Sequence, residues 1–181
     1  TAFQPRRLDV AAFARQAGRL SGQARLHDYE RLARESHSPD ADPPVHWSVQ
    51  GEHRSAVDGV LRPALHLRAQ VVLALNCQRC LGLVEVPLQV DRHFIFVADE
   101  ETAAALDDAS EDDVLALTDD FDLQALIEDE LLLALPLVPR HESCPEPVRL
   151  SAEDAGFQAA QAEAPHPFAA LEALKGDKSS H

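Results

Sequence analysis

The sequence predicts an α+β fold: an antiparallel β-sheet, a meander of three or more strands, with flanking helices and a flexible C-terminal arm. Apolar and polar residues alternate over most of 45–97, which is the period of strands with one face in water. On either side of this region, apolar residues recur at helical spacing. With 181 residues the chain is long enough for one core domain, which we place at residues 1–150.

The N-terminal part is predicted to be helical within 9–35. Apolar residues at helical spacing follow Asp9, a favourable N-cap, and a second short helix is expected at 27–35. The segment 36–44 is rich in proline and aspartate and is therefore predicted as a loop.

The sheet is predicted at 45–97. Its two longest alternating runs, 65–75 and 84–96, lie on either side of the segment Cys77-Gln78-Arg79-Cys80. This order predicts a β-hairpin with two thiols at its tip. Pro87 has no amide to donate, so its strand is expected to be an edge strand or to carry a bulge there.

The region after the sheet is divided by its acidic residues and prolines. An acidic loop is expected at 98–121, in which 98–113 is either a loop or a frayed helix and 114–117 fits a short strand. A helix is expected at 122–135, capped by Asp122 and ended by Pro136. The remaining predictions are a Cys/His segment at 140–144, a low-complexity arm at 151–181, and a short helix at 167–175 within that arm.

Four residues from two places in the chain have the pattern of a metal site. Cys77 and Cys80 have the Cys-x-x-Cys spacing that is typical of half a zinc site, and His141 with Cys144 would supply the other half. One structural zinc ion is the first interpretation, and reduced thiols that pack or face solvent are the second. A redox CxxC is the third, but redox motifs activate their thiolate at a helix N-terminus, whereas this one lies between strands.

The net charge of −15 is unevenly distributed. Residues 99–130 hold 14 acidic residues and no Lys or Arg, whereas residues 1–34 hold seven arginines against three acidic residues. An acidic surface attracts basic proteins, and an arginine-rich segment attracts phosphates, although acidic loops also occur merely as solvated surface. The candidate partner-binding residues are Asp107, Asp108, Glu111, Asp112 and Asp113. The candidate RNA-binding residues are Arg6, Arg7, Arg15, Arg19 and Arg79.

Localisation and enzyme class follow from what the sequence lacks. It contains no run of roughly 18 apolar residues, and its first 25 residues hold five arginines, so we expect a cytoplasmic protein without a membrane partner. It has neither a glycine-rich phosphate loop nor a nucleophile elbow. Glu128, Asp129 and Glu130 are consecutive on a predicted helix, so they cannot face one another as a catalytic pair. We therefore expect no enzymatic activity and no small-molecule substrate.

Three blocks of the sequence resemble the YceD family of large ribosomal RNA accumulation proteins. They are 75–81 (LNCQRCL), 128–139 (EDELLLALPLVP) running into His141 and Cys144, and 165–171 (PHPFAAL) followed by Leu174 and Lys175. The resemblance implies a bacterial cytoplasmic protein needed for the synthesis, processing or stability of 23S ribosomal RNA, with no catalytic activity. Some relatives carry several cysteines after the proline-ended helix, where this chain offers His141 and Cys144.

Two hypotheses about function follow. In the first, the protein contacts 23S ribosomal RNA or its precursor through its arginines. In the second, it is an acidic adaptor or chaperone that binds a basic large-subunit ribosomal protein or maturation factor without touching RNA. Composition favours the second, because RNA-binding modules usually have a basic footprint and stacking aromatics, whereas aromatic residues are 5% of this chain.

Overall fold

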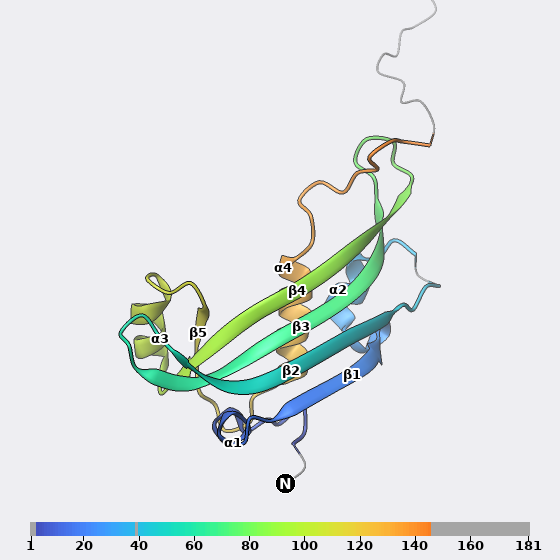
Figure 1. Ribbon diagram of the computed structural model, residues 1–181. Coiled ribbons are helices and arrows are strands. Elements are labelled where there is room, and N and C mark those ends of the chain that lie inside the picture. The colour runs from blue at the N-terminus through green and yellow to red at the C-terminus, as the bar shows by residue number, and fades with distance from the viewer. Residues whose placement is uncertain (1–2, 39, 146–181) are drawn as a thin grey trace, which may run out of the picture. The chain divides into compact units, whose positions relative to one another are not determined.

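The computed structural model describes residues 3–38 and 40–145, which form a five-stranded sheet with helices (Figure 1). The strands lie in the order β1 (Arg19–Arg25), β2 (Pro44–Ser55), β3 (Leu61–Asn76), β4 (Leu83–Val97) and β5 (Asp113–Ala116). The helices are α1 (Val10–Arg15), α2 (Glu30–Glu35), α3 (Glu100–Asp107) and α4 (Leu123–Leu133), with a 3-10 turn, η1 (Leu26–Asp28). Neighbouring strands are antiparallel, except that β4 and β5 run parallel. The predicted α+β class is confirmed, while the arm at 151–181 and its helix at 167–175 lie outside the described residues.

The predicted hairpin is formed by β3 and β4, of 16 and 15 residues. Its register places Leu65 opposite Phe94 and Leu73 opposite Val86, so the apolar residues of both strands share one face. At Pro87, β4 pairs with β3 on one side only. On its other side β4 has no partner there within the described residues, because β5 pairs only with the stretch from Phe94 onward. The predicted edge position of this proline is thus confirmed.

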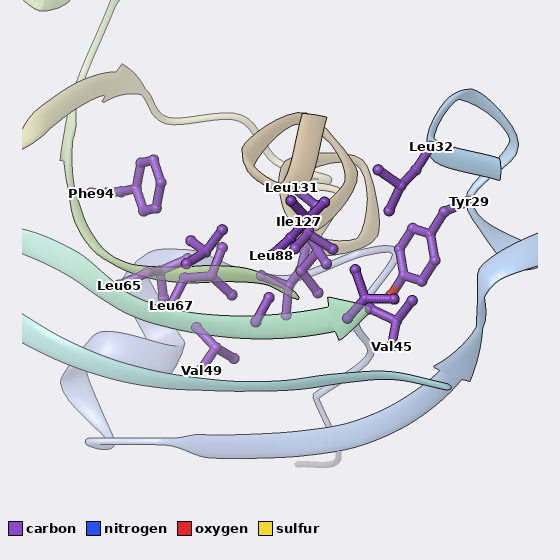
Figure 2. Close-up of a cluster of buried hydrophobic side chains, with 14 of the residues drawn as sticks. Tyr29, Leu32, Val45, Val49, Leu65, Leu67, Leu88, Phe94, Ile127 and Leu131 are labelled. Atoms are coloured by element: carbon purple, nitrogen blue, oxygen red, sulfur yellow. The ribbon is translucent and has the colours of Figure 1, made fainter. Parts of the chain in front are cut away.

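The hydrophobic core lies between one face of the sheet and the helices. Figure 2 shows Ile127 and Leu131 of α4 above Leu88 of β4, with Tyr29 and Leu32 beside them. All five side chains are at most 2% exposed. Burial of an apolar side chain of this size contributes about 1.5–3 kcal/mol, so this layer holds the helices on the sheet.

Helix α4 occupies the range expected from its sequence signals. Asp122 caps it by accepting hydrogen bonds from the amides of Gln124 and Ala125, at 2.9 and 3.1 Å. The helix ends before Pro136, which cannot continue it. None of the helices within the described ranges is long and apolar enough to cross a membrane.

The prediction of helices throughout 9–35 missed β1, which separates α1 from α2. The inward positions of β1 include Gly22, which has no side chain, and Ala24, whose side chain is a single methyl group, so apolar alternation is hard to detect there. Glycine is required at position 22 because a Cβ atom there would lie 2.7 Å from the Trp47 indole, which is too close. β1 therefore fits as an edge strand where a bulkier residue would collide with β2.

The predicted acidic loop at 98–121 contains both α3 and β5, so of the two alternatives for 98–113 the helix is confirmed over 100–107. Asp99 caps α3 by accepting from the Thr102 amide at 2.8 Å, and Glu100 and Glu101 lie in the first turn, where negative charge is favourable. β5 covers 113–116, within one residue of the short strand expected at 114–117. The sequence did not predict that β5 pairs in parallel with β4, because a strand of four residues carries too little pattern to indicate its partner.

Glu128 of α4 joins that helix to α2. Its carboxylate accepts from the Arg31 guanidinium at 2.8 Å, and from the amides of Arg31 and Leu32 at 2.7 and 3.2 Å. Burial raises the pKa of Glu128, but the bonds from Arg31 and from these amides outweigh it, so the pKa lies below its ordinary value.

Glu130, two residues further along α4, lies in the opposite electrostatic environment. It is 6% exposed, and its nearest cation is Arg92, with Nη1 at 3.7 Å from the carboxylate. Burial raises the pKa of Glu130, and Arg92 offsets this only in part because Asp113 and Asp129 add negative charge nearby. The ionised form of Glu130 is therefore disfavoured in the folded protein.

We predict that Glu128→Gln lowers the free energy of unfolding at pH 7, while Glu130→Gln raises it. Because the pKa of Glu128 is lowered in the folded protein, its carboxylate stabilises the fold at pH values above 4.5, and this stability is lost as pH falls through the folded-state pKa. The Glu128→Gln variant should therefore be less stable than wild type by about 1 kcal/mol or more at pH 7, and this difference should shrink in acid. Because the pKa of Glu130 is raised in the folded protein, wild type loses stability as pH rises from 4.5 through the folded-state pKa. The Glu130→Gln variant has no carboxyl group to ionise at this position and should not lose that stability. Urea unfolding from pH 4 to 8 measures both. Destabilisation by both substitutions at pH 7 would contradict this assignment.

Candidate metal centre

The two candidate half-sites meet in space. Cys77 and Cys80 lie in the turn between β3 and β4, and His141 and Cys144 lie in the segment that follows α4, beside that turn (Figure 1). One ligand atom from each of the four residues lies within 4.8 Å of all the others. This Cys3His group could hold a metal ion, and all three thiols are free of disulfide bonds.

The turn at the tip of the hairpin presents both of its thiols to the same side. The Cys77 amide donates to the Gly82 carbonyl and the Leu81 amide donates to the Cys77 carbonyl, both at 2.8 Å. Leu81 adopts a positive φ of 62°, which reverses the chain within the CxxC turn. These backbone hydrogen bonds and the positive φ of Leu81 define the turn.

The segment after α4 is held against this turn by hydrogen bonds from Gln78 and Arg79. The Gln78 amide donates to the Pro139 carbonyl at 2.8 Å. The Arg79 guanidinium donates to the carbonyls of His141 and Glu142 at 3.0 and 3.3 Å, and its Nε lies 3.1 Å from Cys144 Sγ. Arg79 thus fastens the second half-site to the first, which is a role that the sequence did not reveal.

A backbone carbonyl orients the histidine. His141 Nε2 lies 2.9 Å from the Leu83 carbonyl, an acceptor, so Nε2 carries the proton and Nδ1 has a free lone pair. Nδ1 is the atom that faces the thiols, 3.4 Å from Cys80 Sγ. Such an outer hydrogen bond is the usual way in which a metal-binding histidine is fixed in one tautomer. Leu83 takes part through its backbone carbonyl alone, so its role in orienting His141 could not be predicted from the side chains in the sequence.

Cys77 is buried, and its environment favours the thiolate. Burial raises the pKa of this thiol, but hydrogen bonds from the backbones of His141, Cys80 and Arg79 outweigh it and lower the pKa to about 5. Its sulfur lies 3.9 Å from Cys144 Sγ. A thiolate at Cys77 is the protonation state that a metal ion requires.

The predicted RNA-binding arginines do not form one patch. Arg79 is occupied in the Cys/His group, Arg6 is bound to Gln124, and Arg7 makes two bonds to Asp120 at 3.1 and 3.0 Å. Arg15, on α1, and Arg19, on β1, have no ion-pair partner within residues 3–38 and 40–145.

The predicted partner-binding acids are also divided between structural roles and free surface. Asp107 accepts from the Val114 amide at 3.0 Å, Asp112 pairs with Arg54 at 2.8 Å, and Asp113 pairs with Arg92 at 2.6 Å. Asp108 and Glu111 are exposed and make no ion pair in the described part of the chain. Only these two of the five are available to a partner without breaking an internal bond.

The chain matches known proteins over the region that contains the hairpin, α4 and the Cys/His group. The profile of the family described as "Large ribosomal RNA subunit accumulation protein YceD" matches residues 65–175. A protein of Haemophilus influenzae with the same description is 35% identical over 111 residues, which are 60% of this chain and 63% of that protein. The chain thus aligns with somewhat less than two thirds of this relative's length. No match was found among solved structures. Because the profile covers more than half of the chain, the protein belongs to the YceD family of large ribosomal RNA subunit accumulation proteins.

Proposed function

We propose that this protein is a non-catalytic ribosome biogenesis factor that promotes the accumulation of 23S ribosomal RNA through its synthesis, processing or stability. The observation that carries the proposal is the family match at residues 65–175, which includes three of the five strands, α4 and all four members of the Cys3His group. The relative from Haemophilus influenzae is named for the same process.

A structural role for the metal centre supports the non-catalytic part of the proposal. Catalytic zinc sites keep one coordination position for water or substrate, whereas four protein ligands close the coordination sphere. Here all four donors come from the chain itself, and Arg79 covers Cys144 from outside. A metal ion in this group would therefore hold the segment after α4 against the hairpin tip.

The donor set and its spacing fit zinc. In a tetrahedral site with Zn–S of about 2.3 Å, neighbouring sulfurs lie about 3.8 Å apart, and a sulfur and a histidine nitrogen about 3.5 Å apart. The sulfurs of Cys77 and Cys144 are 3.9 Å apart, and Cys80 Sγ is 3.4 Å from His141 Nδ1. Thiolate and imidazole donors select zinc over calcium or magnesium, which prefer oxygen.

Deletion of the gene should lower the amount of 23S relative to 16S ribosomal RNA, because the proposed factor acts on the large subunit alone. The ratio is measured on total RNA, and sucrose gradients should show fewer mature large subunits. Expression of the wild-type chain from a plasmid is the control and should restore both. An unchanged ratio in a clean deletion would exclude the proposed function.

The protein purified under reducing conditions without chelator should contain about one zinc ion per chain. Cys80→Ser removes one ligand, so the zinc content should fall below about a tenth of an equivalent and the thermal unfolding temperature should fall with it. Elemental analysis and calorimetry measure the two effects.

Gln78→Ser provides the matched control, since its side chain contacts only the carbonyl of Asn76 within the same turn. This variant should retain the zinc ion and its stability. If wild-type protein carries no zinc and all three thiols react freely, the group consists of reduced cysteines.

The acidic adaptor is a second candidate mechanism for the same outcome. It is favoured by the acidic excess of residues 99–130, part of which remains unpaired at Asp108 and Glu111. These two side chains would bind cationic groups of a basic large-subunit protein, with an attraction that weakens as salt increases.

The adaptor mechanism predicts that tagged protein captures basic ribosomal proteins from cell extract even after nuclease treatment. Asp108→Asn combined with Glu111→Gln should weaken this capture, with a change in stability of less than about 0.5 kcal/mol because both positions are exposed. The control, Glu35→Gln with Asp40→Asn, removes two exposed charges elsewhere and should leave capture intact. Complete loss of ribosomal partners after nuclease would favour direct RNA contact.

A further inference from the structure

The face of the sheet opposite the core is polar over much of β1 to β4, whereas α3 covers its end near β5, where Ala103 packs against Val97 and Val114. In Figure 1, α2 and α4 lie behind the sheet, and the other face is turned toward the viewer. Strand pairing arranges the outward side chains of β1 to β4 in cross-strand rows. We call the following set the open sheet face: Arg19, Ser21 and Gln23 of β1; His46, Ser48 and Gln50 of β2; His66, Arg68 and Gln70 of β3; Gln89, Asp91 and His93 of β4.

The charge of the open sheet face differs from that of the whole protein. The chain carries −15, whereas the charged residues of this face are Arg19, Arg68 and Asp91, with Glu52 at its border 3.6 Å from His93. Asp91 is already neutralised, because Arg68 and His66 contact its two oxygens at 3.0 and 2.5 Å. Arg19 has no ion-pair partner among the described residues. Positive charge that is not paired within the fold is therefore concentrated at Arg19, next to Arg68.

Two shallow hollows on this face adjoin each other. The first, of about 290 Å³, is lined by the polar side chains of Arg19, Ser21, Ser48, Gln50, His66 and Arg68, and no carboxylate lines it. The second, of about 600 Å³, shares Ser48 and Arg68 with the first and continues toward His46, Gln70 and Gln89, and Asp91 lines it beside Arg68. Together they form a continuous shallow track across β1 to β4, and its end at Arg19 has no carboxylate in its lining.

We propose that the open sheet face binds the sugar-phosphate backbone of single-stranded RNA, with one phosphate group held between Arg19 and Arg68. This inference deepens the proposed function and rests on it. Arginine donates paired hydrogen bonds to phosphate oxygens, while serine and glutamine bind phosphate and the ribose hydroxyl.

The composition of the face favours RNA over an acidic protein as the occupant. A protein partner would bury an apolar centre within its interface, but the outward positions of this set are polar, and the outward apolar pair Val72 and Pro87 lies beyond them toward the hairpin tip. The face also lacks an aromatic platform for stacking, because the Trp47 indole packs against Gly22. We therefore expect backbone contacts with little preference for base sequence.

The test measures binding of the full chain to a fluorescein-labelled single-stranded RNA of mixed sequence by fluorescence anisotropy at several salt concentrations. Arg19→Gln should weaken binding by about fivefold or more at low salt, and should reduce the slope of log affinity against log salt by about 0.7, the value for one lost phosphate contact. Arg34→Gln is the matched control, because Arg34 is an exposed arginine on α2, across the sheet, and it should change affinity by less than about twofold.

A second pair of variants tests the same track without removing an arginine. Ser48 lies where the two hollows join, so Ser48→Asp would place a negative charge beside the bound phosphate and should weaken binding by about tenfold or more. Ser48→Ala keeps the charge unchanged and should alter affinity by less than about threefold. Circular dichroism and thermal unfolding establish that each variant is folded.

Three outcomes would overturn the inference: no binding of RNA by wild type, equal losses in Arg19→Gln and Arg34→Gln, or tighter binding of a labelled polyglutamate peptide than of RNA. The last outcome would identify an acidic protein as the occupant. Absence of RNA binding together with a lowered 23S-to-16S ratio in the deletion strain refutes this inference alone. Intact RNA binding with an unchanged ratio refutes the proposed function instead.

Discussion

The antiparallel pairing of β3 with β4 positions every other feature of this molecule. Because side chains alternate along a strand, the register that places Leu65 opposite Phe94 directs one set of residues into the core and the other into water. A shift by one residue would expose the apolar set and bury Arg68 and Asp91. The same register determines which residues reach the turn, and hence where Cys77 and Cys80 lie. The core, the cysteine turn and the open sheet face thus depend on one set of backbone hydrogen bonds.

The Cys3His group closes the fold at the end of this hairpin. Cys77 and His141 are separated by more than 60 positions in the chain, yet Gln78 and Arg79 already bind the backbone of the second segment. A metal ion would therefore complete an arrangement that is largely organised by hydrogen bonds. The Leu83 carbonyl belongs to β4, so strand pairing also determines which nitrogen of His141 faces the thiols.

The two oppositely charged segments of the sequence are bound to each other within the fold. Arg7 pairs with Asp120, and Arg31 pairs with both Glu128 and Asp129. The arginines of the N-terminal segment that remain unpaired include Arg19, which lies in a strand rather than in a helix. Charge that looks free in the sequence is therefore partly internal, and the charge available to a partner lies at fewer sites.

Local patterns in the sequence determined the long strands, α4 and the four candidate ligands. Each of these depends on residues close together in the chain: alternation over 65–75 and 84–96, a cap at Asp122 with a stop at Pro136, and the Cys-x-x-Cys spacing. The tertiary structure alone decided the features that need a distant partner. β1 is too weakly patterned to be recognised without the strand beside it, and the parallel pairing of β5 with β4 depends on a strand far away in the chain. Arg79 and Asp112 could be assigned as internal bonding partners only after the fold placed Cys144 and Arg54 next to them, because a hydrogen bond depends on proximity in space and not on spacing in the chain.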